Sequence, residues 1–128
     1  MRPAPHPSSL DPRLARACIN LSGLKKGILC DPFCGSGGIL LEAGKMRLRT
    51  VGFDLDAFML KRARKNLQHF SVVNSVLKEH DATEKKNYSM HIDAIVTDLP
   101  YGKSTKLYER KRDELYESFL QTLQKLDC

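Results

Sequence analysis

The feature that most constrains the fold is the stretch Asp31-Pro-Phe-Cys-Gly-Ser-Gly-Gly38. The apolar run Gly27–Cys30 precedes it, and the apolar segment Ile39–Ala43 follows it. This order of segments predicts a buried strand, a tight turn and a helix. Glycine accepts positive φ and lets backbone N–H groups approach a ligand closely, so a turn of this kind is a candidate nucleotide-binding site.

The charge of this turn discriminates between the ligands that glycine turns hold. A dinucleotide fingerprint needs a third glycine at position 40, where the chain has leucine, and a P-loop needs a Gly-Lys-Ser/Thr sequence, which does not follow. Asp31 precedes the first glycine of the turn and would repel a pyrophosphate. S-adenosylmethionine carries an ammonium and a sulfonium but no phosphate, so the carboxylate favours this ligand. A turn without any ligand stays open as the alternative.

The length of 128 residues predicts a single domain with a modest core. Residues 1–10 hold three of the six prolines and show no periodicity, so we expect an extended arm before a domain over residues 11–128. No apolar run approaches the ~20 residues of a membrane span. The four cysteines lack the spacing of zinc ligands. We therefore expect a cytoplasmic protein with free thiols, no membrane association and no metal, and a net charge of +6 that suits a polyanionic partner.

Apolar periodicity predicts helices alternating with strands. Strands are expected over residues 28–30, 50–54, 76–80 and 92–97, and helices over 38–46, 57–70 and 110–126. An earlier helix would start after an Asp11 cap, end at Gly23 and bury Leu14, Cys18 and Leu21. Alternating strands and helices indicate a parallel sheet, and the order 3-2-1-4 places Asp31 and Asp98 at its switch point, where open α/β sheets bind ligands.

Two of these helices have predicted faces. The helix over 57–70 is expected to bury Met59, Ala63, Leu67 and Phe70, and to expose Lys61, Arg62, Arg64 and Lys65. The helix over 110–126 is expected to bury Leu115, Phe119, Leu123 and Leu126.

Two further carboxylates follow predicted strands. Asp54 comes 17 residues after Gly37, close to the ~20-residue offset at which an acidic residue binds a ribose. Asp56 is interpreted as the cap of the next helix. Asp81 would lie at the same sheet edge and could accept from an adenine amine, with Ala82 leaving room for the ring. An ordinary loop carboxylate is the alternative interpretation of both Asp54 and Asp81.

The sequence Thr97-Asp-Leu-Pro-Tyr-Gly102 follows the predicted fourth strand. Asp98 and the Leu99 carbonyl could accept both hydrogens of an exocyclic amine, and Tyr101 could stack on the base. Pro100 would stiffen the backbone between them. The alternative is a simple Pro-Tyr-Gly turn that leaves the strand.

Three motifs together, Asp31–Gly38, Gly52–Asp56 and Thr97–Gly102, resemble class I S-adenosylmethionine-dependent methyltransferases that methylate amines. With residues 2–17 included, nearly the whole chain is similar to the archaeal tRNA guanosine-N2 methyltransferases, relatives of the eukaryotic tRNA guanosine methyltransferase catalytic subunit. The resemblance implies a Rossmann-like α/β sheet of parallel strands, truncated before the last strands. It also implies direct methyl transfer to the N2 amine of a guanosine in tRNA.

The resemblance assigns roles to individual residues. The expected catalytic residues are Asp98, Leu99, Pro100 and Tyr101. The expected cofactor-binding residues are Asp31, Phe33, Cys34, Gly35, Gly37, Asp54, Leu55, Asp81 and Ala82.

The chain departs from the family pattern in two ways. Leu99 stands where the family has the first proline of Asp-Pro-Pro-Tyr, which restores an N–H and backbone freedom. The RNA-binding THUMP region and the later strands of the family lie outside these 128 residues, so a separate RNA-binding domain or subunit is expected. Two alternatives stay open: a DNA adenine-N6 or cytosine-N4 methyltransferase, and a non-catalytic cofactor-binding fragment or partner subunit. The arm, residues 2–10, favours RNA.

The stretch Lys103–Arg112 directly follows the predicted base-binding loop. It has five cations against one acid. Cations at a helix start are locally unfavourable, and phosphate contact would explain them. We therefore expect tRNA contacts from Lys103, Lys106, Arg110, Lys111 and Arg112. A solvated loop and helix start is the alternative.

Overall fold

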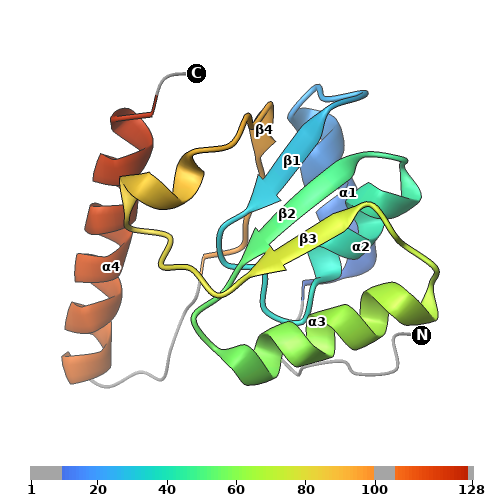
Figure 1. Ribbon diagram of the computed structural model, residues 1–128. Coiled ribbons are helices and arrows are strands. Elements are labelled where there is room, and N and C mark those ends of the chain that lie inside the picture. The colour runs from blue at the N-terminus through green and yellow to red at the C-terminus, as the bar shows by residue number, and fades with distance from the viewer. Residues whose placement is uncertain (1–9, 100–105, 127–128) are drawn as a thin grey trace.

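The computed structural model describes residues 10–99 and 106–126 (Figure 1), so the expected arm, except Leu10, lies outside the described residues. One parallel sheet has the order β3-β2-β1-β4. Its strands are β1 (Ile28–Asp31), β2 (Arg49–Phe53), β3 (Ser75–Lys78) and β4 (Ala94–Ile95). The predicted strand order and the parallel pairing are confirmed.

Helices cover both faces of the sheet (Figure 1). The helices are α1 (Pro12–Leu21), α2 (Gly38–Lys45), α3 (Ala57–His69) and α4 (Lys106–Gln124), with a short 3₁₀ helix η1 (Lys85–Tyr88). Leu29 of β1 belongs to a core cluster with residues of α1 and α2, whereas its neighbour Cys30 belongs to a cluster with Tyr88 of η1, against which Leu126 just after α4 packs. Successive side chains of β1 therefore belong to different layers, as a strand buried on both faces requires.

The predicted buried face of α1 is wrong by one residue position. The Asp11 cap is confirmed, since its Oδ1 accepts from the Arg13 N–H at 2.8 Å. However, α1 buries Ala15 and Ile19, while Leu14 is 52% and Leu21 is 86% exposed. Both stripes contain apolar residues, so periodicity alone could not choose between them. A contact distant in sequence accompanies the observed rotation: Arg16 of α1 donates to the buried carboxylate of Glu42 in α2 at 2.9 Å.

The predicted face of α3 is partly correct. Ala63 and Leu67 are buried, but Met59 and Phe70 are only half-buried. Leu60 and Asn66 are buried instead. Asn66 is polar and gave no apolar pattern, yet its Nδ2 donates to the Ser36 carbonyl at 2.9 Å and so ties α3 to the glycine turn.

The strand and helix ends also differ from those predicted. β4 is limited to Ala94–Ile95, and just before its start the Asp93 carboxylate, rather than a backbone carbonyl, accepts from the Ile28 N–H at 2.8 Å. β3 ends at Lys78, where the His80 N–H turns back to the Lys78 carbonyl at 3.0 Å. α4 begins at Lys106 rather than 110, and it buries Phe119 as predicted together with the unpredicted Thr122.

Within the described part of the chain, no helix is both long and apolar enough to cross a membrane.

Candidate active site

A pocket of about 370 Å³ opens where the strands end at their carboxyl side. It is lined by most of the predicted site residues, namely Asp31, Phe33, Cys34, Gly35, Asp54, Leu55, Asp81, Ala82, Asp98 and Leu99. Gly37 lies outside the lining, and Pro100 and Tyr101 lie outside the described residues. Residues from four separate strand ends therefore converge on one cavity, which is the expected consequence of a parallel sheet.

The glycine turn forms one wall of the pocket. Gly35 and Gly37 have φ of +52° and +87°, a region that glycine enters without penalty. The turn is fixed to β2, because the Cys34 N–H donates to the Phe53 carbonyl at 2.9 Å. A Cβ on Gly37 would lie 3.1 Å from the Cβ of Ala63 in α3. Gly37 therefore lets α3 approach the turn, while Gly35 faces the pocket.

Asp31 is the most deeply buried of the pocket carboxylates, at 2% exposure. Its Oδ1 accepts from Thr97 Oγ1 at 2.5 Å and from the Phe33 N–H at 3.1 Å. Burial raises the pKa of Asp31 to about 7; the two hydrogen bonds oppose this rise, and the Asp54 and Asp98 carboxylates add to it. A cation placed beside Asp31 would favour its charged form.

Asp54 connects β2 to the glycine turn. Its Oδ2 accepts from the Gly35 N–H and its Oδ1 from the Asp56 N–H, both at 2.9 Å. A carboxylate offers about four acceptor positions, so each oxygen keeps capacity for a ligand hydroxyl. The predicted cap is confirmed as well, because Asp56 Oδ1 accepts from the Phe58 N–H at 2.9 Å.

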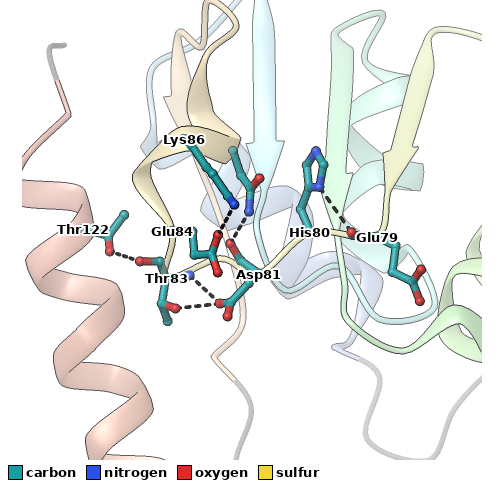
Figure 2. Close-up of polar contacts among 8 residues, drawn as sticks. Glu79, His80, Asp81, Thr83, Glu84, Lys86 and Thr122 are labelled. Carbon is teal, nitrogen blue, oxygen red and sulfur yellow. Dashed lines mark hydrogen bonds and ion pairs between the residues drawn. The ribbon is translucent and has the colours of Figure 1, made fainter.

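The Asp81 loop, residues 81–83, is fixed by side chains from other elements (Figure 2). Its three successive carbonyls accept from Asn87 Nδ2 at 2.8 Å, Tyr88 Oη at 2.7 Å and Thr122 Oγ1 at 2.5 Å. Asp81 Oδ1 accepts from the Thr83 N–H at 2.8 Å and from Thr83 Oγ1 at 2.6 Å. With its carbonyls engaged by the protein, the loop presents the Asp81 carboxylate and the small Ala82 to the pocket.

Several lining residues were missed by the sequence analysis as parts of the site. Met59, His80 and Leu115 are examples. Met59 was assigned to the core, but it lies in the first turn of α3, and its Cε is 3.5 Å from where a Cβ on Gly35 would be. Leu115 shares its helix face with Phe119, whose ring meets the Phe33 ring edge-on at a centroid distance of 4.9 Å. The i, i+4 spacing of Leu115 and Phe119 was therefore the sequence signal that could have assigned Leu115 to the pocket.

The pocket chemistry restricts the reactions it can support. Desolvation raises the pKa of the half-buried Asp98 carboxyl, which makes it a better proton acceptor than an ordinary aspartate. Burial raises the pKa of Cys30 to about 12 and that of Cys34 further, so neither supplies a thiolate nucleophile at neutral pH. Among the residues that the structure describes, none form a His, Cys, Asp and Glu group able to hold a metal.

Comparison with known proteins places this site in a family. The sequence model described as "RMKL-like, methyltransferase domain" matches residues 1–127. The tRNA (guanine(10)-N2)-dimethyltransferase of Methanothermobacter thermautotrophicus is 46% identical over 120 residues, which cover 93% of this chain and 35% of that protein. The enzyme of the same name from Pyrococcus abyssi is 44% identical over 124 residues, covering 95% of this chain and 37% of that protein.

A solved structure gives the same result for the fold. The crystal structure of TrmN from Thermus thermophilus superposes with a TM-score of 0.78 at 27% identity, covering 91% of this chain and 35% of that chain. The chain thus spans about a third of the length of the relatives it matches. Because the family model covers nearly all of its residues, the chain belongs to the RMKL-like methyltransferase domain family.

Proposed function

We propose that this chain is the cofactor-binding and catalytic part of an S-adenosylmethionine-dependent methyltransferase that methylates the N2 amine of a guanosine in tRNA. The observation that carries the proposal is the convergence of Asp31, Asp54, Asp81 and Asp98 on one pocket. Four carboxylates disfavour a pyrophosphate and favour a cationic, hydroxyl-rich ligand. The identity with two archaeal tRNA (guanine(10)-N2)-dimethyltransferases supports the substrate class.

The pocket fits the chemistry of S-adenosylmethionine group by group. Asp54 has free acceptor capacity for the ribose hydroxyls, and Asp81 can accept from the adenine amine beside the small Ala82. Asp31 lines the pocket beside the glycine turn and would favour the charged methionine part of the ligand. When bound, the cofactor supplies an electrophilic methyl group on its sulfonium. The protein's own contribution is to hold that ligand in a pocket partly walled by apolar side chains such as Leu55 and Met59.

Asp98 and Leu99 would hold the target amine on the other side of the pocket. Asp98 and the Leu99 carbonyl can accept the two amine hydrogens, which aligns the nitrogen lone pair with the methyl group. The raised pKa of Asp98 suits it to accept the proton that the amine loses. Stacking by Tyr101 and stiffening by Pro100 stay predictions, because both residues lie outside the described part. A base in a stem would be flipped out at a cost of a few kcal/mol.

The RNA partner is proposed to meet the chain beyond this loop. Lys103, Lys106 and Arg110 belong to the predicted contact stretch, but their side chains lie outside the described residues. Lys111 is exposed, and the half-buried Arg112 has its Nε 3.8 Å from Asp113 Oδ1. A separate RNA-binding domain or subunit completes the proposal. The cytoplasm is the proposed location, because the free thiols of Cys18, Cys30 and Cys34 suit a reducing compartment.

The decisive experiment compares the chain with its Asp98→Asn variant. Both are incubated with isotopically labelled S-adenosylmethionine and either tRNA or duplex DNA, and the nucleosides are analysed by mass spectrometry. We expect N2-methylguanosine from tRNA with the unmodified chain and none with Asp98→Asn, while calorimetry gives similar cofactor affinities for both. The exposed Glu117→Gln serves as a matched control and should retain activity.

Three other outcomes would contradict the proposal. Methylated adenine or cytosine from DNA would replace RNA by DNA as the substrate. Cofactor binding without any methylated product would leave a non-catalytic cofactor-binding subunit. Full turnover by Asp98→Asn on a confirmed substrate would remove Asp98 from the mechanism.

A further inference from the structure

The outer side of α3 carries a row of basic residues. Within Ala57–His69, four lysines and arginines and one histidine occur without a single acidic residue. Phe58, Lys61, Arg62 and Lys65 are spaced i, i+3, i+4 and i+7 and so share one helix face, which we call the α3 stripe. Arg64 is exposed on the adjacent flank. The opposite side of the helix packs into the core through Leu60, Ala63 and Leu67.

These cations differ from those of α1. Both arginines of α1 are in ion pairs, Arg13 with Asp11 and Arg16 with Glu42. Among the described residues, by contrast, Lys61, Arg64 and Lys65 take part in none of the ion pairs.

The cations of α3 also repel one another. Lys61 and Lys65 are i,i+4 neighbours, and Lys61 with Arg64 and Arg62 with Lys65 are i,i+3 neighbours. Each such like-charge pair destabilises a helix by about 0.2–0.5 kcal/mol. Charge pairing within α3 therefore does not explain this arrangement, whereas an anionic partner would.

An exposed aromatic ring begins the stripe. Phe58 is 59% exposed, and the Arg62 guanidinium carbon lies 4.7 Å from the ring centroid. An aromatic ring beside an arginine is the arrangement on which unpaired nucleobases stack. Leu55, three residues earlier, is 65% exposed and lines the candidate active site, so the stripe starts at the mouth of the pocket. From Phe58 to Lys65 the helix advances about 10 Å.

We propose that the α3 stripe is an RNA-binding surface, in which Phe58 stacks an unpaired base and Lys61, Arg62 and Lys65 contact the adjoining phosphates. The inference rests on the proposed function for the identity of the polyanion. It adds a surface beside the pocket to the RNA contacts that the sequence predicts for Lys103–Arg112.

The test separates the electrostatic contribution from stacking. RNA affinity of the full chain is measured with a tRNA transcript between 50 and 300 mM salt, on the order of the range in which phosphate contacts are screened. In Lys61→Gln/Lys65→Gln, we expect the slope of log K against log salt to fall by about 0.7–0.9 per lost contact. In Phe58→Ala we expect an unchanged slope and an affinity about 5- to 150-fold lower, the loss expected for one stacked base.

A matched control carries the same charge change elsewhere. Lys25→Gln/Lys26→Gln removes two exposed cations from the loop before β1, at the opposite edge of the sheet, and should keep the unmodified slope. Binding of the demethylated cofactor, measured by calorimetry, should be unchanged in all variants and reports that each is folded. Anionic phospholipid vesicles provide a second polyanion. We expect Lys61→Gln/Lys65→Gln to bind these vesicles with the same affinity as Lys25→Gln/Lys26→Gln, or a higher one.

Each other outcome has a separate meaning. If the unmodified chain binds tRNA and the stripe variants match the lysine control, the stripe is not an RNA surface and the proposed function stands. If the stripe variants lose vesicle binding but keep RNA binding, the surface serves a membrane and the inference is wrong. If the unmodified chain binds the cofactor but shows no salt-dependent tRNA binding, the RNA substrate and the stripe both fail.

Discussion

The two loops that are proposed to bind opposite ends of the cofactor are built in different ways. The glycine turn after β1 depends on the positive φ of Gly35 and Gly37 and on close packing against α3, and backbone and side-chain contacts from Phe53, Asp54 and Asn66 tie it to the rest of the fold. The Asp81 loop after β3 is held by side chains, with Thr122 reaching it from 39 positions further along the chain. The first loop therefore requires glycine at defined positions, whereas the second requires a set of separate side-chain donors.

This difference teaches what a mutation in each loop should do. In the glycine turn, conformation and close packing leave no alternative residue, so a substitution should affect folding and binding together. In the Asp81 loop, three separate donors share the task, so the loss of one should be tolerated. The following predictions test this contrast, from the largest expected effect to the smallest.

Gly37→Ala should be the most damaging change. The positive φ costs about 1–2 kcal/mol for a residue with a Cβ. Contact with the Ala63 backbone, whose Cα would lie 3.3 Å from the new Cβ, adds about 1–3 kcal/mol of overpacking. Gly23→Ala is the matched control, because Gly23 also has positive φ, +76°, but nothing lies within 4 Å of its Cβ position. Urea unfolding of both variants measures the difference, and equal losses would show that α3 does not press on the turn.

Acidification should weaken cofactor binding through Asp31. Its carboxyl has a pKa of about 7, raised by burial, so lowering the pH through 7 neutralises the group and removes its attraction for a cationic ligand. If only the ionised form binds, affinity falls by about tenfold per pH unit below 7. Calorimetry with S-adenosylmethionine between pH 5.5 and 8.5, roughly spanning that pKa, measures this. Asp31→Asn should remove the dependence; a variant that keeps it would assign the titration to another group.

Asp54→Ala should lower cofactor affinity by about 1.5–3 kcal/mol, the usual loss for a hydrogen bond to a charged acceptor. The carboxylate accepts from the Gly35 N–H and, in the proposed complex, would also accept from the ribose hydroxyls. The demethylated cofactor and its 2′-deoxyribose analogue distinguish the two roles by calorimetry. If the ribose contact is correct, the variant should discriminate less between them than the unmodified chain. Unchanged affinity would exclude Asp54 from the site.

Thr122→Val should have the smallest effect, about 1 kcal/mol of cofactor affinity, because one neutral hydrogen bond to the Thr83 carbonyl is lost and two neighbouring carbonyls keep their donors. The discrimination between the adenosine and inosine forms of the demethylated cofactor should fall as well, since the loop carries Asp81. Thr122→Ser keeps the hydroxyl and should restore both. If Thr122→Val lost as much cofactor affinity as Gly37→Ala, the contrast between the loops would be wrong.

The sequence predicted those features whose causes are local. The glycine turn and the caps at Asp11 and Asp56 each follow from a few adjacent residues, and all are confirmed. The strand order, which is also confirmed, came instead from the alternation of strands and helices along the whole chain. The pocket-lining carboxylates were found for the same reason, because strand ends in a parallel sheet share one edge. Their roles stay proposals.

The features that the sequence did not predict depend on contacts between distant segments. The rotation of α1 is associated with the Arg16–Glu42 pair, and no apolar pattern contains that information. Thr122 and Asn66 are polar residues on helix faces that pack inward. Each donates a hydrogen bond to one distant backbone carbonyl, Thr122 to that of Thr83 and Asn66 to that of Ser36. β4 starts later than its apolar run, where the Asp93 side chain takes the place of a backbone acceptor for the Ile28 N–H.

The hydrogen bond between Thr122 and the Asp81 loop also has a thermodynamic consequence. α4 follows the proposed base-binding loop, and Thr122 of the same helix donates to the Asp81 loop, which is proposed to bind the adenine. If nucleic acid stabilises this placement of α4, it raises the affinity for the cofactor, and linkage requires that the cofactor raise the affinity for nucleic acid by the same factor. The affinity for the demethylated cofactor would rise by the same route, so this product would dissociate slowly while the RNA stays bound. Turnover would then be governed by RNA departure rather than by methyl transfer.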